Sequence, residues 1–264
     1  MSRILTALVA VPLLLLLILK GPGWLFLALA LVFALACYWE LTRLASKLGV
    51  RLLAVGYPLT ALSVAAFYPG FPGFVSTSLA MLLVLGLAAV FTREPGLETL
   101  AAVAGTAFAI FYAGALLGTM VGLRAAPDEQ GRLWILFLLA VIMMGDAGAF
   151  YVGRSLGKRP LAPVLSPKKT VAGLWGGISF SVATAVLLRF LAFPHLALPA
   201  AIGLGLSLAI FGVIGDLFES LLKRSAGVKD TSSLLPGHGG VLDRIDSLLF
   251  ASPFLFLYVN WAGL

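Results

Sequence analysis

Several acidic side chains stand inside or at the edge of long apolar stretches, where water cannot solvate their charge. Four of the eleven acids share this setting: Glu40, Asp146, Asp216 and Glu219. A charge at the centre of a bilayer costs about 2.5–3.5 kcal/mol on insertion scales, so such acids are candidates for function. For Glu40, close to Arg43, a functional acid and an ion-paired structural acid are both open interpretations.

Asp216 belongs to a regular pattern of polar residues. Asp216, Glu219, Ser220 and Lys223 have the spacing i, i+3, i+4 and i+7, which predicts one face of a helix. Acids suit a hard cation such as Mg²⁺, and a basic helix end suits phosphate oxygens. A structural ion pair between Glu219 and Lys223 is the alternative, but it leaves Asp216 unexplained.

The most polar stretch of the chain follows at 223–246, with four bases, three acids and one of the two histidines. Its glycines permit close backbone approach to an anion, although alone they indicate only turns. Asp243 and Asp246 are three positions apart, which places them on one helical face. The segment therefore predicts a metal–polyphosphate site at a membrane surface.

The same residues carry a family resemblance. S-x-x-K-R stands at 220–224, K-D at 229–230 and P-x-H-G-G-x-x-D-R-x-D at 236–246. A second block runs from G-D-A-G-A-F-Y-V-G-R at 145–154 to S-P-K-K-T at 166–170. This pattern resembles the phosphatidate cytidylyltransferase (CDP-diacylglycerol synthase) family, specifically over 145–172 and 212–246. The chain departs from it at Ala172, where the family usually has glutamate.

The resemblance implies the reaction CTP + phosphatidate → CDP-diacylglycerol + pyrophosphate, dependent on Mg²⁺, with a second cation left open. Metal binding is assigned to Asp146, Asp216, Asp243 and Asp246, and catalysis to Asp216, Lys223, Asp243 and Asp246. Binding of the substrate phosphates is assigned to Lys168, Lys169, Ser220, Arg224, Lys229, His238, Gly239, Gly240 and Arg244. We expect His238 to bind phosphate or orient the glycine loop, not to act as a base. The expected partners are CTP, phosphatidate and membrane lipids; a homodimer is left open.

Three other functions predict different products or residue patterns. A CTP-dependent polyprenol or lipid-alcohol kinase would release CDP instead of pyrophosphate. A CDP-alcohol phosphotransferase requires D-G-x-x-A-R followed by spaced aspartates, which this sequence lacks. An ion-coupled transporter would place acids stepwise across the bilayer, whereas these acids cluster with bases and glycines.

Composition predicts the elements that position these residues. Hydrophobic residues make up 61% and charged residues 11% of the 264 positions, against about 25% charged in soluble domains. These values exclude a water-soluble enzyme and a disordered chain. We expect an all-α, polytopic integral membrane protein with about nine spans, at 4–20, 23–42, 52–68, 74–92, 99–123, 132–152, 173–192, 197–222 and 247–263. The single cysteine, Cys37, excludes an internal disulfide.

The basic residues indicate orientation. Fourteen of the 18 Lys and Arg residues fall at the N-terminus and in the even-numbered connections, and four on the other side. The positive-inside rule then places the N-terminus and the active site in the cytoplasm, in the inner membrane. The net charge of +7 is therefore a topology signal, with no nucleic acid expected. We expect one membrane domain over 1–264, with less specific spans in 1–130 and the catalytic region in 131–264.

Overall fold

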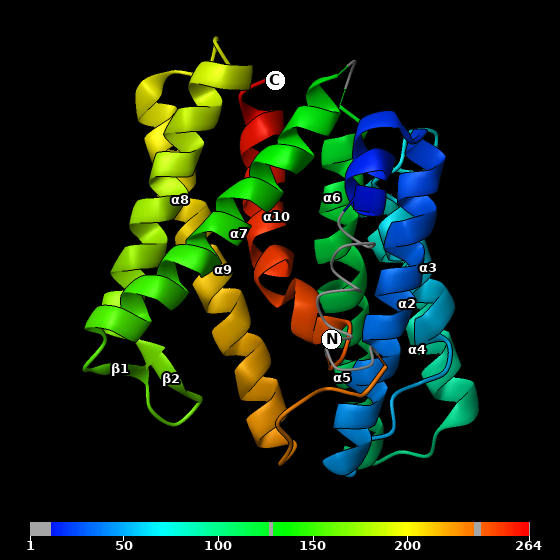
Figure 1. The fold of residues 1–264 in the computed structure, drawn as a ribbon. Coiled ribbons are helices and arrows are strands. Elements are labelled where there is room, and N and C mark those ends of the chain that lie inside the picture. Colours follow the sequence, from blue (N-terminus) through cyan, green and yellow to red (C-terminus); the bar gives the residue numbers. More distant parts are fainter. Residues whose placement is uncertain (1–11, 127–128, 235–238, 264) are drawn as a thin grey trace. The chain divides into compact units, whose positions relative to one another are not determined.

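The computed structural model describes residues 12–126, 129–234 and 239–263, and it is almost entirely helical, as predicted (Figure 1). Residues 12–20 are helical. The further elements are α2 (Gly23–Lys47), α3 (Gly56–Ala65), α4 (Phe74–Thr92), α5 (Leu97–Ala109), the π-helical η1 (Ile110–Ala115), α6 (Leu116–Arg124), α7 (Gln130–Leu156), β1 (Pro160–Ala162), β2 (Ser166–Thr170), α8 (Val171–Ala192), α9 (Leu198–Ser225) and α10 (Leu242–Trp261).

Six helices of the described chain are long and apolar enough to cross a membrane. They are α2, α4, the continuous helix Leu97–Arg124 formed by α5, η1 and α6, and α7, α8 and α9. The protein is therefore a multi-pass membrane protein, as its composition predicts.

The predicted count of about nine spans is not confirmed. The predicted span 52–68 contains only α3, which has ten residues and a length of about 15 Å, half the thickness of the hydrocarbon core. The predicted span 247–263 overlaps α10 up to Trp261, and α10, which carries Asp243, Arg244 and Asp246 in its first turns, is not among the six. The predicted span 4–20 is described only from residue 12.

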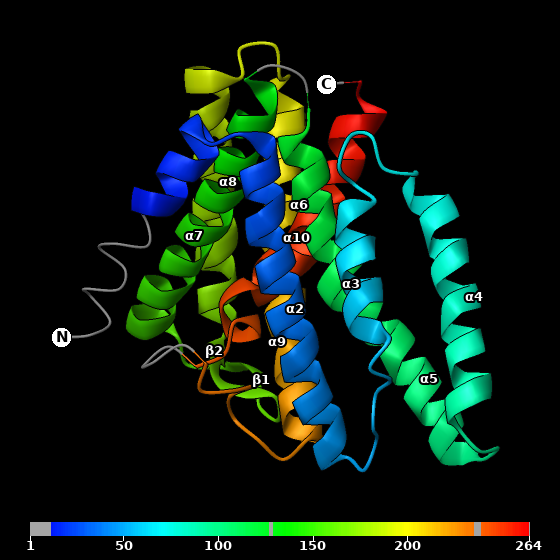
Figure 2. The ribbon, with the colours of Figure 1, turned by 90° about the vertical axis from the view of Figure 1, so that its right-hand side faces the viewer.

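The chain divides into two compact units. Unit 1 comprises Met1–Ala125 and Leu222–Arg244, and α2, α3 and α6 pack together in it. The connection between α2 and α3 is fixed by buried hydrogen bonds. The Tyr38 hydroxyl donates to the Leu53 carbonyl at 2.8 Å, and the Leu53 N–H donates to the Thr106 hydroxyl at 2.9 Å. Figure 2 shows α4 beside α5, and α4 buries few of its side chains.

Unit 2 comprises Ala126–Leu221 and Ile245–Leu264. Its helices α7 and α8 lie side by side, joined by the antiparallel hairpin β1–β2 (Figure 1). Glycines line the seam between these helices: a Cβ at Gly148 would lie 2.8 Å from the Gly176 carbonyl oxygen. The Ser181 hydroxyl also donates to the Val141 carbonyl across the seam at 3.0 Å. Small residues thus let the two backbones approach closely, as is usual for packed membrane helices.

Candidate functional site

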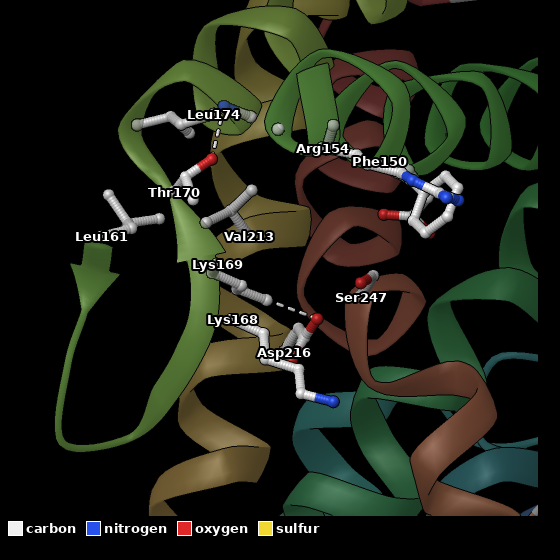
Figure 3. A pocket seen from close by; sticks show the side chains of 14 residues that line it. Phe150, Arg154, Leu161, Lys168, Lys169, Thr170, Leu174, Val213, Asp216 and Ser247 are labelled. Carbon is white, nitrogen blue, oxygen red and sulfur yellow. Dashed lines mark hydrogen bonds and ion pairs between the residues drawn. The ribbon is translucent and has the colours of Figure 1, made fainter. Parts of the chain in front are cut away.

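A pocket of about 650 Å³ lies in unit 2, between α7, α8, α9, the first turns of α10 and the hairpin β1–β2. Figure 3 shows Phe150 and Arg154 on one side, and Leu161, Thr170 and Leu174 on the other. The complete lining is Asp146, Ala149, Phe150, Gly153, Arg154, Leu161, Lys168, Lys169, Thr170, Gly173, Leu174, Val213, Asp216 and Ser247. Four of the sequence-predicted site residues are brought together here: Asp146, Lys168, Lys169 and Asp216.

The charged residues of the pocket interact directly. The Lys169 ammonium group lies 2.5 Å from the Asp216 carboxylate, and the two side chains are 26% and 32% exposed (Figure 3). Asp146, on α7, lines the same pocket, and so does the exposed Lys168. The pocket therefore contains two carboxylates and three bases when Arg154 is included. Such a mixed set can bind a phosphate together with its counter-cation.

The local sequence explains how the lysines reach this position. Lys168 and Lys169 lie on β2, which leads directly into α8. Thr170 is the N-cap of α8, and its hydroxyl accepts a hydrogen bond from the Gly173 N–H at 3.1 Å. This cap ends the strand and starts the helix at a fixed residue. A Cβ at Gly157 or Gly153 would collide with or crowd the Thr170 side chain, so glycine permits the close approach of α7.

The pocket's donor set fits Mg²⁺ held partly by substrate. In the described residues, no group of three or more His, Cys, Asp or Glu side chains is arranged to hold a metal. Mg²⁺ is commonly bound by one or two carboxylates, with waters and substrate phosphates completing its octahedron. Asp146 and Asp216 provide two carboxylates at one pocket, next to bases that would hold the phosphates.

Asp243, in the first turn of α10, anchors the 223–246 segment of unit 1. One carboxylate oxygen accepts from the Lys223 ammonium group at 2.7 Å. The other accepts from the Thr231 N–H at 3.1 Å, the Thr231 hydroxyl at 3.0 Å and the Gly240 N–H at 2.7 Å. Asp243 thus joins the end of α9, the loop and the start of α10. Its predicted role in metal binding stays a prediction.

Glu40 is the second anchor of the same segment. Its side chain is fully buried, and its carboxylate accepts from the Ser232 hydroxyl at 2.6 Å, the Val241 N–H at 2.9 Å and the Leu242 N–H at 2.8 Å. A Cβ at the buried Gly240 would collide with the Glu40 carboxylate and the Thr231 hydroxyl. Glycine is therefore required here by space.

The remaining predicted site residues have varied surroundings. Ser220 is buried, whereas Arg224, Lys229 and Arg244 are exposed. Gly239 has a φ of +80°, in the left-handed region that favours glycine. Asp246 accepts a hydrogen bond from the Ser247 N–H at 2.7 Å. His238 lies outside the described residues.

The sequence-predicted site did not include several polar residues that the structure places in the pocket or the loop. Arg154 and Ser247 line the pocket, and Thr231 binds Asp243. Arg154 ends the G-D-A-G-A-F-Y-V-G-R block, so the motif could have identified it. Ser247 follows Asp246 directly and Thr231 follows Asp230, but no spacing rule distinguishes these hydroxyls from other loop hydroxyls.

Together, the spans and the pocket define a multi-pass membrane protein with a site suited to phosphate and a divalent cation. The chain matches the Cytidylyltransferase family over residues 1–262, and it belongs to that family. It is 42% identical over 163 residues to a phosphatidate cytidylyltransferase of Bacillus subtilis, a match covering 62% of this chain and 57% of that protein.

Two further relatives extend the comparison. The uncharacterized protein YnbB of Escherichia coli is 34% identical over 254 residues, which are 92% of this chain and 82% of that protein. A phosphatidate cytidylyltransferase of Staphylococcus epidermidis is 41% identical over 127 residues, covering 48% of this chain and 49% of that protein. The matches thus span only about half the length of the two relatives named as phosphatidate cytidylyltransferases.

Proposed function

We propose that this protein is a CTP:phosphatidate cytidylyltransferase, which makes CDP-diacylglycerol and pyrophosphate for phospholipid synthesis. The observation that carries the proposal is the pocket in which Lys168, Lys169 and Arg154 lie beside Asp146 and Asp216. Family membership and the names of the relatives support the same activity.

The chemistry requires charge neutralisation more than a protein nucleophile. A phosphate oxygen of phosphatidate attacks the α-phosphorus of CTP, and the bond from that phosphorus to the bridging oxygen of the β-phosphate breaks. Pyrophosphate leaves with the bonding electrons. Because two anions must meet, bases have to reduce their repulsion and hold the leaving group. In this proposal Lys168, Lys169 and Arg154 do so in the pocket.

Mg²⁺ would be held by Asp146 and Asp216, where it would neutralise phosphate charge and stabilise the departing pyrophosphate. In the 223–246 segment, Lys223, Arg224, Lys229 and Arg244 are proposed to bind phosphates. We also propose that Asp243 and Asp246 take part in metal binding. A second cation is left open in this proposal.

The test is a turnover assay on purified protein in detergent or liposomes. CTP labelled at the α-phosphorus should transfer its label to a chloroform-soluble lipid when phosphatidate is present, with one pyrophosphate released per lipid formed. Transfer of label from the γ-phosphorus to a lipid alcohol, with release of CDP, would instead identify a lipid-alcohol kinase. No nucleotide turnover, together with ion-driven solute uptake in liposomes, would identify a transporter.

We also propose that the protein lies in the cytoplasmic membrane with its N-terminus and the 223–246 segment in the cytoplasm. The distribution of Lys and Arg supports this orientation, and the nine-span topology remains part of the proposal. Ser233 is exposed, so a Ser233→Cys variant should react with a membrane-impermeant maleimide only after cells are opened. Cys37 is the only native cysteine and is buried, which keeps background labelling low. Labelling in intact cells would overturn the orientation.

A further inference from the structure

The segment that joins α7 to α8 carries positive charge that no neighbouring acid in the sequence neutralises. Residues 154–169 contain five Lys or Arg residues and no Asp or Glu. Three of these bases line the pocket, but Lys158 and Arg159 do not. Both of these side chains are exposed. Their charge therefore faces surroundings other than the pocket.

Lys158 and Arg159 lie where the hairpin β1–β2 begins, at the adjoining ends of α7 and α8 (Figure 1). The helix α7 ends at Leu156, two residues before Lys158. The Val171 N–H, at the first residue of α8, donates to the Arg159 carbonyl at 3.0 Å. Both helices are long and apolar enough to span a membrane. The two bases therefore lie where a pair of spanning helices reaches the membrane surface.

Two exposed aromatic residues mark the level of that surface. Tyr151 on α7 is 67% exposed and Trp175 on α8 is 63% exposed. Tyr and Trp side chains favour the headgroup level of a bilayer, because their rings are apolar but carry one polar group. At 1.5 Å per residue, Tyr151 lies about 8 Å before the end of α7, and Trp175 about 6 Å after the start of α8. Lys158 and Arg159, beyond both helix ends, therefore lie at the level of the lipid phosphates.

Bases at this level match anionic phospholipids. Ammonium and guanidinium groups form charge-assisted hydrogen bonds with phosphate oxygens, and basic segments next to a membrane helix attract anionic headgroups. A zwitterionic headgroup offers the same phosphate but carries its own cation beside it. An acidic soluble protein could match the charge, but it would have to approach the hairpin at the depth that Tyr151 and Trp175 mark. The surroundings of the two bases therefore favour a lipid.

We propose that Lys158 and Arg159 form a docking surface for the headgroups of resident anionic phospholipids, separate from the pocket. The occupant is a lipid such as phosphatidylglycerol, which is not a substrate of the proposed reaction. The strand β2 of the same hairpin carries Lys168 and Lys169. Headgroup binding at this surface therefore holds the hairpin that presents these two lysines to the pocket, and it connects the position of the hairpin to the charge of the membrane.

The test measures which lipids surround the hairpin when no substrate is present. A fluorophore is attached to a Ser155→Cys variant, because Ser155 is exposed near the end of α7 and the native Cys37 is buried. The protein is placed in liposomes of phosphatidylcholine and phosphatidylglycerol, and one lipid at a time carries a nitroxide quencher near the glycerol end of an acyl chain. At equal mole fraction, labelled phosphatidylglycerol should quench the fluorophore at least about two-fold more than labelled phosphatidylcholine. Raising the salt from about 0.1 M to about 1 M should remove this excess quenching, because the screening length falls from about 10 Å to about 3 Å.

Variants assign the excess quenching to particular residues. Lys158→Gln with Arg159→Gln should abolish it without lowering the melting temperature, since both side chains are exposed. Lys158→Arg with Arg159→Lys keeps the charge and should retain it. Arg132→Gln is the control, because Arg132 lies near the other end of α7, about 36 Å along the helix, and its loss should change nothing. The pocket variant, Lys168→Gln with Lys169→Gln, should retain most of the excess quenching.

Three results would overturn the docking surface. Excess quenching that survives in the variant with Lys158→Gln and Arg159→Gln would show that these bases do not bind the lipid. Loss of the excess quenching in the pocket variant would assign the anionic lipid to the pocket. Equal quenching by both lipids with all bases in place would reject the lipid and leave an acidic soluble partner as the match for this charge. Because no nucleotide is present, the proposed transferase activity can fail without affecting any of these results.

Discussion

The Glu40 carboxylate accepts a hydrogen bond from the backbone N–H of Leu242 at 2.8 Å, although the two residues are 202 positions apart. Leu242 is the first residue of α10, and the first N–H groups of a helix lack partners within the helix. A carboxylate at this end also interacts favourably with the helix dipole. The helix that carries Asp243 therefore begins at a point fixed by a residue of α2.

This relationship predicts the effect of Glu40→Gln. The glutamine side chain would have the same size as the glutamate side chain. Its NH₂ group, however, would face at least one of the three groups that now donate a hydrogen bond to the Glu40 carboxylate. Each buried donor left without an acceptor costs about 1–3 kcal/mol, so we expect a clearly lowered melting temperature and reduced turnover. Glu94→Gln, at an exposed acid of the same unit, is the control and should change neither. Wild-type stability of Glu40→Gln would show that the anchor is dispensable.

Asp216→Asn separates catalysis from stability. The Lys169–Asp216 pair is about 30% exposed, and partly exposed ion pairs contribute about 1 kcal/mol or less. We therefore expect a small shift of the melting temperature but a loss of turnover of at least about 100-fold, because an amide cannot hold Mg²⁺ as a carboxylate does. Glu129→Gln, an exposed acid of unit 2, should retain activity. Retained turnover with a lowered melting temperature would remove Asp216 from metal binding.

The proposed metal requirement predicts a second pattern. EDTA should abolish turnover and added Mg²⁺ should restore it. Asp243→Asn and Asp246→Asn should each abolish turnover at all Mg²⁺ concentrations while membrane insertion stays normal. Because Asp243 also binds Thr231 and Gly240, Asp243→Asn should in addition lower the melting temperature strongly. Near-normal activity of both variants would exclude these residues from the site.

The seam between α7 and α8 predicts a packing effect. At Gly176 an added Cβ would meet the Val152 side chain and lie 2.9 Å from the Gly148 carbonyl oxygen. Overpacking of this kind destabilises by about 1–3 kcal/mol, so Gly176→Ala should lower the melting temperature. At Gly203 an added Cβ meets nothing within 4 Å, and Gly203→Ala should be neutral or slightly stabilising. If Gly176→Ala and Gly203→Ala changed the melting temperature equally, α7 and α8 would be able to move apart at the seam without loss of stability.

The sequence predicted the pocket residues better than the anchors. Lys168, Lys169 and Asp146 belong to one motif block, and helical spacing singled out Asp216; all four line one pocket. Glu40 could be interpreted only as functional or paired, because its partners lie about 200 positions later and no local pattern connects them. Hydrogen bonds between residues so far apart in the chain cannot be predicted from residue spacing.

Long-range hydrogen bonds also explain why the third predicted span, 52–68, is shorter in the structure. Residues 52–68 are apolar enough to suggest a membrane helix, but hydropathy does not detect where a helix begins. Hydrogen bonds from Tyr38 and to Thr106 hold Leu53 in the non-helical connection before α3. Tertiary contacts thus delay the start of the helix to Gly56, four residues after the predicted start.

The glycine seam also bears on how the protein is made. The helices α7 and α8 and the hairpin between them follow one another in the chain, so their mutual contacts need no later segment. Contacts between neighbouring segments form early, because little chain entropy is lost in closing them. The helical hairpin could therefore assemble in the membrane while α9 is still being synthesised, with Lys168 and Lys169 already presented on β2. Asp216 would arrive later, with α9, and Ser247 of α10 would complete the pocket.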